Sequence, residues 1–263
     1  MKLLMIGCGK MGGALLGGLI ANNFVKSDIL VVDRHVKRVA DYGVKAVESI
    51  DEVTNFMPDV ILLAVKPQMM DEILSRLKEV SSLETLVISV AAGKNLGYYE
   101  KALSDQPIIR VMPNLPALVG KGVSVMCANQ EVGSDLKQMA QELFASVGQV
   151  FWLEDEAAMD AVTAISGSGP AYVFHFLECL VKAGQELGLP DELAKMLAYS
   201  TVTGSALLAD QSDKTAKELK EQVMSPKGTT EAGINTLSKD HALEKLLKAT
   251  TKAACDRSKE LAV

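Results

Sequence analysis

The first residues of the chain that could carry chemistry form a glycine-rich turn, Gly7-Cys8-Gly9-Lys10-Met11-Gly12. An apolar run at residues 2–6 precedes the turn, and the helix-forming segment Ala14-Leu15-Leu16 follows it. The order of strand, tight turn and helix is typical of a loop that binds the pyrophosphate of a dinucleotide. Gly7 allows the sharp turn, Gly9 lets the backbone approach the pyrophosphate, and Gly12 lets the helix pack on the strand. The free N–H groups and the positive dipole end of the helix then face the phosphates.

An acidic residue stands where such a loop needs one. A second apolar run, residues 29–32, ends on Asp33, which is 21 residues after Gly12. A carboxylate at that distance accepts hydrogen bonds from the ribose hydroxyls of a dinucleotide. The alternative is a glycine-rich turn that binds nothing, and the combination of strand, helix, spacing and acid argues against it.

Two islands of small and hydroxyl residues interrupt the apolar helices of the second half, SGSGPA at 166–171 and SPKGTT at 225–230. An interior glycine costs a helix about 1 kcal/mol, so the first island indicates either a closely crossing helix or a ligand, and we favour packing. The helix after the second island begins with hydroxyls and free N–H groups, which suit a small carboxylate. On spacing alone, capping of that helix by Ser225 or Thr229 is the simpler explanation.

Other kinds of site find little support. His175 and Cys179 are spaced i, i+4, which is half of a metal site, but no third ligand follows at a suitable spacing. We therefore predict no metal and place both residues in a helical core. The chain has no G-x-S-x-G motif and no Cys/His pairing that indicates covalent catalysis. What remains is a reaction in which a bound cofactor supplies a hydride.

Composition narrows the function further. The 263 residues carry a net charge of −6 with no basic run, which argues against nucleic-acid and membrane partners. The four cysteines are scattered, as expected in a reducing, cytosolic compartment. The uncharged run at residues 162–177 contains serines, glycines, a proline and a histidine, so we predict a buried helix there rather than a membrane span.

Strands and helices alternate up to about residue 153, and only helices follow. This pattern predicts an α/β domain of the Rossmann type followed by an all-α domain, with a boundary near Glu154. The predicted strands cover residues 2–6, 29–32, 44–47, 59–65, 85–90, 108–112, 122–127 and 149–153. The predicted helices before the boundary cover residues 49–55, 67–80, 95–103 and 135–147. Those after it cover residues 157–187, 191–209, 215–224, 230–238 and 242–261.

The predicted sheet brings several loops together. In an open parallel sheet, ligands bind at the carboxyl ends of the strands. We therefore expect residues 7–12, 33–34, 64–67, 91–93 and 112–114 to line one crevice.

With these motifs in view, the chain resembles the pyrroline-5-carboxylate reductases. The resemblance extends over almost its whole length, through IGCGKMGGALLGGL, LLAVKPQ, ISVAAG, RVMPNLPALVGKG, AISGSGPAYVF and LKEQVMSPKGTTEAGINTL. The last two motifs are the most specific, because other dinucleotide-binding families build their helical domain differently.

The resemblance implies a Rossmann domain at residues 1–154 and a helical domain at 155–263 that binds substrate and dimerises. Family members form homodimers through the interlocked C-terminal helices, sometimes assembled into larger rings. The implied reaction is hydride transfer from NADPH or NADH to the C=N carbon of 1-pyrroline-5-carboxylate. Its product is L-proline, and it is the last step of proline biosynthesis.

The resemblance also assigns site residues. The substrate site comprises Ser225, Lys227, Gly228, Thr229, Thr230 and Asp213, and Thr230 matches the active-site threonine whose hydroxyl reaches the ring nitrogen. Cofactor residues are Gly7, Cys8, Gly9, Lys10, Met11, Gly12, Asp33, Arg34, Ala64, Val65, Lys66, Pro67, Ala91, Ala92 and Asn114, the last three near the nicotinamide.

Three positions depart from the family pattern. Many relatives have small or amide residues where this chain has Asp33-Arg34. Asp33 should repel the 2′-phosphate of NADPH while Arg34 and Arg38 attract it, and we favour NADH. Leu115 replaces the usual threonine of the M-P-N-T-P motif, and Lys227 stands where glycine is common.

Two other functions remain open from the sequence. A β-hydroxyacid dehydrogenase has the same two-domain plan, but it relies on a lysine and an asparagine of the long interdomain helix, and no asparagine follows Lys182 there. A nucleotide-sensing protein that uses the same fold would leave Thr230 idle.

Overall fold

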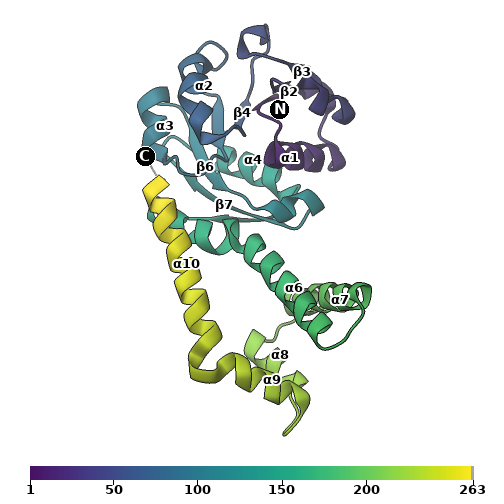
Figure 1. The fold of residues 1–263 in the computed structure, drawn as a ribbon. Coiled ribbons are helices and arrows are strands. Elements are labelled where there is room, and N and C mark those ends of the chain that lie inside the picture. The colour runs from purple at the N-terminus through teal and green to yellow at the C-terminus, as the bar shows by residue number, and fades with distance from the viewer. Residues whose placement is uncertain (262–263) are drawn as a thin grey trace. The chain divides into compact units, whose positions relative to one another are not determined.

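A computed structural model describes residues 1–261 of the chain (Figure 1). They form two compact units. The first contains residues 1–168 and 254–261, and the second contains residues 169–253. This division falls later in the chain than the boundary expected near Glu154, because the residues just after Glu154 pack with the first unit.

The first unit is built on one eight-stranded sheet in the order β3-β2-β1-β4-β5-β6-β7-β8. The strands from β1 to β6 run parallel, β7 runs antiparallel to β6, and β8 runs parallel to β7. The carboxyl ends of β1 to β6 therefore share one edge, as expected for the glycine-rich turn and the loops around it. The strands are β1 (Leu3–Ile6), β2 (Ile29–Val32), β3 (Lys45–Val47), β4 (Val60–Leu63), β5 (Leu86–Ser89), β6 (Ile108–Met112), β7 (Gly122–Ala128) and β8 (Gly148–Trp152).

Both faces of this sheet are buried, which explains the almost continuous apolar strands. Alternate residues of β1 enter opposite cores: Leu3 and Met5 point to one, Leu4 and Ile6 to the other. Helices α1 (Lys10–Ala21) and α4 (Ser134–Ala145) cover the first core. Helices α2 (Met70–Leu77) and α3 (Leu96–Leu103) cover the second.

One expected helix of this unit is wrong. Residues 49–55 contain only a single 3-10 turn, Ile50–Glu52. Ser49 and Glu52 form a capping box around that turn, but Val53 already leaves the helical conformation with a ψ of 88°. Asn55, two residues later, has a positive φ of 56°. The other three helices lie within a few residues of their predicted positions.

The long helix predicted at 157–187 is interrupted. A 3-10 turn (Glu156–Ala158) and α5 (Met159–Val162) are followed by a π turn at Thr163–Gly167 and then by α6 (Gly169–Glu186). The N–H of Ser168 reaches the carbonyl of Thr163, at 2.8 Å. A Cβ on Gly167 would lie 3.2 Å from the sulfur of Met112. At this glycine the small-residue island therefore serves close packing, whereas Gly169 faces open space.

The second unit consists of helices only. They are α6, α7 (Asp191–Asp210), α8 (Ala216–Val223), α9 (Thr229–Ser238) and the first half of α10 (Ala242–Leu261). Helices α6 and α7 approach closely where Gly184 meets Ala194, since a Cβ on that glycine would lie 3.2 Å from the alanine Cβ.

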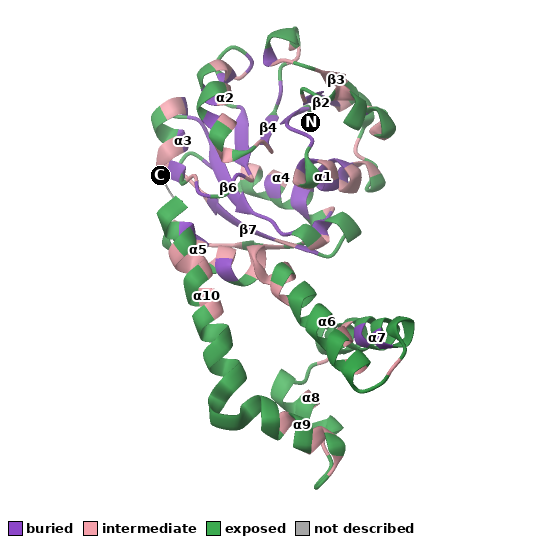
Figure 2. Cartoon of the chain, viewed as in Figure 1, coloured by how far each residue is buried: buried purple, intermediate pink, exposed green. Residues whose placement is uncertain are grey.

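Most side chains of the second unit are exposed in the single chain (Figure 2). The prediction of a buried helix at 162–177 is therefore wrong for most of α6, where Phe174 is 55% and Phe176 is 52% exposed. One chain has too few helices here to cover both sides of α6, and Leu177 is its only buried residue. Among residues 1–261, no helix is both long enough and apolar enough to cross a membrane.

Candidate active site

The structure gives a different account of the glycine at each of the three positions in the first turn. Gly7 has a φ of +95°, and a Cβ there would lie 2.7 Å from the carbonyl oxygen of Ala64. A Cβ on Gly12 would clash with the carbonyl oxygen of Gly7. A Cβ on Gly9, in contrast, would meet nothing within 4 Å. The protein itself does not need a glycine at position 9, so its surroundings fit the close approach of a ligand.

Helix α1 begins at this turn with unused donors. Gly9 is the N-cap and offers no side chain to cap the helix, and the first backbone bond of the helix runs from Gly13 N to Gly9 O, at 2.8 Å. The N–H groups of the intervening first turn have no acceptor within the helix. Together with the helix dipole, they provide a binding site for phosphate oxygens.

Asp33 is held rigidly beside the same turn. Its Oδ2 accepts the backbone N–H of Cys8 at 2.6 Å, and its Oδ1 accepts the N–H of His35 at 2.8 Å. Each carboxylate oxygen keeps a further lone pair for another donor. The position fits the ribose hydroxyls of a dinucleotide, as the spacing from Gly12 predicts.

A cavity of about 420 Å³ joins these features. It lies at the carboxyl ends of β1, β2 and β4, within the first unit. Of the predicted cofactor residues, it is lined by Gly7, Gly9, Asp33, Arg34, Ala64, Val65 and Lys66. The glycine cradle, the free helix donors and the fixed carboxylate are together a fit for NAD(P)H.

The remaining predicted cofactor residues lie in the same unit but do not line this cavity. Cys8 belongs to the turn, Lys10, Met11 and Gly12 to the start of α1, and Pro67 to the 3-10 turn before α2. Ala91 and Ala92 follow β5, where Ala91 is buried and Ala92 is exposed.

Asn114 follows β6, is 8% exposed and forms hydrogen bonds through both ends of its amide group. Its Oδ1 accepts the N–H of Val123 at 2.8 Å, and its Nδ2 donates to Ser166 at 3.3 Å. The side chain therefore ties the end of β6 to the π turn. Contact of Ala91, Ala92 and Asn114 with a nicotinamide stays a prediction.

The sequence did not predict two ion pairs between acidic and basic side chains at this cavity. The guanidinium of Arg34 lies 3.5 Å from the carboxylate of Glu72, and Arg76 forms an ion pair with Asp51. Glu72 and Arg76 are spaced i, i+4 on α2, so they share the helix face toward the end of β2. That spacing, combined with the expectation that the carboxyl ends of the strands share one edge, is the signal that could have identified them.

The thiol of Cys8 is not a nucleophile here. Burial, and then the negative charge of Asp33, raise its pKa to about 11, while Arg38 opposes the shift. A thiol with this pKa stays protonated at neutral pH. Its backbone N–H, which binds Asp33, is the group that matters to the site.

Five of the six predicted substrate residues, all except Asp213, lie together in the second unit, in the loop before α9 and in the first turn of that helix. The N–H of Gly228 donates to the carbonyl of Ser225 at 2.9 Å, which closes a tight turn ahead of α9. Lys227 has a φ of 60°, a conformation that favours glycine, and its N–H donates to Glu231 at 2.6 Å. Thr230 lies partly buried in the first turn of α9.

The predicted capping of α9 by Ser225 or Thr229 is wrong. Gly228 is the N-cap and no side chain caps the helix, because Thr229 is already helical and Ser225 belongs to the turn before it. Asp213 lies in the turn ahead of α8, so one helix separates it in sequence from this loop. The roles of these residues toward a substrate stay predictions.

His175 and Cys179 do not lie in a core. Both are exposed on α6, and the imidazole lies 3.3 Å from Glu178 and 3.8 Å from the sulfur of Cys179. No group of three potential metal ligands occurs within residues 1–261.

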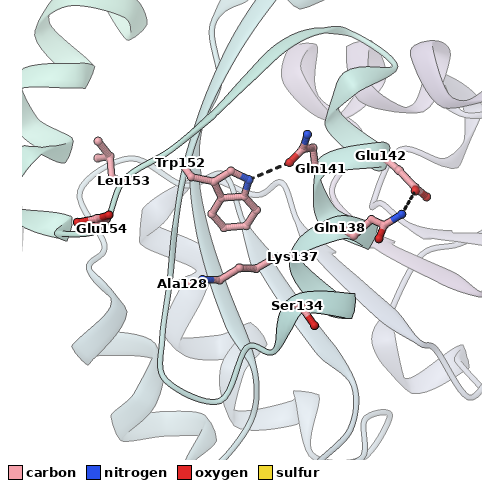
Figure 3. A pocket seen from close by; sticks show the side chains of 9 residues that line it. All are labelled: Ala128, Ser134, Lys137, Gln138, Gln141, Glu142, Trp152, Leu153 and Glu154. Atoms are coloured by element: carbon pink, nitrogen blue, oxygen red, sulfur yellow. Dashed lines mark hydrogen bonds between the residues drawn. The ribbon is translucent and has the colours of Figure 1, made fainter.

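A larger hollow of about 670 Å³ lies elsewhere, between α4 and the end of β8 (Figure 3). Because β7 runs antiparallel to β6, this end of β8 lies at the edge opposite the glycine-rich turn. Its polar groups bind one another: Trp152 donates to Gln141 at 3.2 Å, and Gln138 to Glu142 at 3.0 Å. The hollow contains none of the predicted site residues.

Comparison with known proteins agrees with this geometry. Residues 156–261 match the family described as pyrroline-5-carboxylate reductase dimerisation, and residues 2–93 match the family described as NADP oxidoreductase, coenzyme F420-dependent. The chain is 38% identical over 266 residues to the pyrroline-5-carboxylate reductase of Pseudomonas aeruginosa, covering 99% of this chain and 97% of that protein.

Solved structures of similar fold indicate the same family. The pyrroline-5-carboxylate reductase of Coxiella burnetii has a TM-score of 0.92 and 34% identity, over 100% of this chain and 98% of that one. The Plasmodium falciparum pyrroline carboxylate reductase, solved with NADP bound, has a TM-score of 0.88 and 34% identity over the same shares. This chain belongs to the pyrroline-5-carboxylate reductase family.

Proposed function

We propose that this protein reduces 1-pyrroline-5-carboxylate to L-proline with NADPH or NADH, the last step of proline biosynthesis. The observation that carries the proposal is the cradle at Gly9, where the free donors of α1 and the fixed carboxylate of Asp33 meet in one cavity. Family membership supplies the substrate. A cytosolic location, expected from the scattered cysteines, is part of the same proposal.

The cofactor, when bound, supplies the hydride for the C=N carbon. The chain must then hold the imine and keep its nitrogen protonated or hydrogen-bonded, because negative charge otherwise develops on that nitrogen. Thr230 is suited to this task, since its hydroxyl is a neutral donor that orients the ring and relays a proton from water.

Backbone donors beside Thr230 support a site for the substrate carboxylate. The first backbone bond of α9 runs from Ala232 N to Gly228 O, at 3.2 Å, so the preceding N–H groups of its first turn have no helical acceptor. These donors and the helix dipole favour an anion. We assign the substrate carboxylate to the backbone of residues 225–230, with Asp213 as a further substrate residue.

The structure gives less support than the sequence to the alternative function, that of a β-hydroxyacid dehydrogenase. Lys182 would have to serve as its catalytic lysine. The Nζ of Lys182 lies 2.7 Å from Glu178 on the exposed surface of α6, where it forms an ordinary i, i+4 ion pair.

The proposal is tested by oxidation of NADH and NADPH, in separate assays, on addition of 1-pyrroline-5-carboxylate, with L-proline measured as product. Thr230→Ala should lose most of kcat while cofactor binding survives, and Thr230→Ser should retain activity because it keeps the hydroxyl. Thr236→Ala is the matched control: within the described residues its hydroxyl donates to the carbonyl of Ala232 on the same helix, at 3.1 Å. Cofactor binding without proline formation would exclude the proposed reaction, and an unchanged kcat in Thr230→Ala would remove Thr230 from the mechanism.

A further inference from the structure

The cofactor cavity contains both signs of charge, and their arrangement bears on which dinucleotide it accepts. Three carboxylates and four cations line it, namely Asp33, Glu48, Glu72, Arg34, Arg38, Lys66 and Arg76. A simple charge count would favour the extra phosphate of NADPH. The ion pairs show which of these cations are already engaged.

The carboxylate of Asp33 cannot easily turn away from a ligand. Two backbone donors, Cys8 N and His35 N, hold its two oxygens at 2.6 and 2.8 Å. Its remaining lone pairs can accept a ribose hydroxyl, whereas a 2′-phosphate would meet a fixed negative charge at short range. Moving Asp33 aside would break both backbone bonds.

Two of the four cations have acidic partners. Arg34 lies 3.5 Å from Glu72, and Arg76 is paired with Asp51. A 2′-phosphate that recruits Arg34 must first compete with Glu72 for it. Arg34 follows Asp33 directly in the chain and is therefore the cation placed nearest in sequence to the ribose position.

We infer that this cavity selects NADH over NADPH, and that Glu72 is a specificity-determining residue because it engages Arg34. The inference rests on the proposed function for the identity of the cofactor. Asp33 supplies the direct discrimination against the 2′-phosphate. Glu72 acts through Arg34, as a positioning residue.

The test uses binding as well as turnover. Dissociation constants for NADH and for NADPH are measured by cofactor fluorescence on the full-length protein without imine, and kcat/KM is measured with each cofactor. The unmodified protein should bind NADH more tightly. Glu72→Gln should shift the affinity ratio toward NADPH by about two- to fivefold, the range of an exposed ion pair. Asp33→Ser should shift it by on the order of tenfold or more.

Two further variants separate the role of Glu72 from a general change in charge. Glu79→Gln removes the same charge just after α2, from an exposed residue outside the cavity, and should leave the ratio unchanged. Arg34→Ala combined with Glu72→Gln should abolish the gain of the single variant. An equal shift in Glu72→Gln and Glu79→Gln would overturn the role of Glu72.

Tighter binding of NADPH by the unmodified protein would overturn the inference as a whole. The binding measurement also keeps this result apart from the proposed reaction. A protein that binds NADH selectively, with the expected shift in Glu72→Gln but no proline formed, would leave the inference standing and remove the proposed function.

Discussion

At the scale of single residues, Gly7 and Gly9 provide a matched pair of substitutions. Gly7→Ala puts a side chain at a φ of +95° and 2.7 Å from a carbonyl oxygen, so it should lower the free energy of unfolding by about 1–3 kcal/mol. Gly9→Ala meets no atom within 4 Å and affects only an N-cap, so its cost should stay below about 1 kcal/mol.

The effect of Gly9→Ala on cofactor binding should differ from its small effect on stability. Gly9→Ala should keep its fold and lose dinucleotide affinity, because its new methyl group occupies space that the pyrophosphate needs. Urea denaturation and cofactor titration on the same preparations give both quantities. Full cofactor affinity in a folded Gly9→Ala protein would mean that the pyrophosphate does not approach this turn.

Cys8 gives a prediction that depends on pH. Its folded pKa of about 11 lies above the ordinary value of 9.0, so the folded state holds the thiol proton more tightly than the unfolded state. The resulting stabilisation is present below pH 9 and is lost as the pH rises through 11. At pH 8, iodoacetamide should label Cys8 at least on the order of a hundredfold more slowly in the folded than in the urea-unfolded protein. Mass spectrometry of the labelled peptide measures both rates, and equal rates would contradict a buried, protonated thiol.

Single residues were predictable where a short motif fixes both backbone and chemistry. The glycines and Asp33 lie as their spacing requires, because strand, turn and helix are local structures. The sequence did not predict which residues Glu72 and Asn114 contact. Those partners, Arg34 and Ser166, come from segments far apart in the chain, and only the folded sheet brings them together.

At the scale of elements, a partly buried ion pair connects β6 to the start of the helical segment. Arg110 is 4% exposed, and its guanidinium lies 2.6 Å from Glu156, which also accepts the N–H of Leu96 at the start of α3. The Nε and the second terminal nitrogen of Arg110 have no hydrogen-bond partner in the described part of the chain. Glu156 is therefore the main compensation for a buried positive charge.

Removal of Glu156 should consequently be costly. Glu156→Ala is expected to lower the free energy of unfolding by about 3 kcal/mol, since it leaves the guanidinium buried and unpaired. Arg110→Met added to Glu156→Ala should recover part of that loss, because no uncompensated charge remains. Glu154→Ala, at an exposed position nearby, is the control for denaturant unfolding. A loss in Glu156→Ala no larger than in this control would mean that the pair contributes little.

Elements were predictable where apolar periodicity decides the structure, as in β6, found at residues 108–112 as expected. The two failures have local physical causes. Residues 49–55 had helix-like composition, but a capping box can stabilise a single turn, and the chain leaves the helical conformation at Val53. The π turn at Thr163–Gly167 adds a residue to a helical turn, and periodicity over a long apolar segment does not register that shift.

At the scale of the whole molecule, the two units differ in how they are stabilised. The first has a sheet with a core on each face, which one chain completes. The second exposes large apolar side chains on its helices, and residues 156–261 match a dimerisation family. The family resemblance predicted a homodimer through these helices, but the apolar pattern alone does not distinguish a face that a second copy covers from one that the same chain covers.

This difference predicts that folding and association of the helical unit are linked. A dimer gains stability with protein concentration, so the thermal midpoint should rise as the protein is concentrated. Phe174→Glu, at a 55% exposed position of α6, should shift the native mass toward the 28.1 kDa chain and lower that midpoint. Leu83→Glu is the matched control, an apolar residue that is 67% exposed in the first unit; it should change neither quantity. A midpoint independent of concentration, together with a dimeric Phe174→Glu protein, would place the interface away from this face of α6, and the apolar side chains of that face would then need another partner.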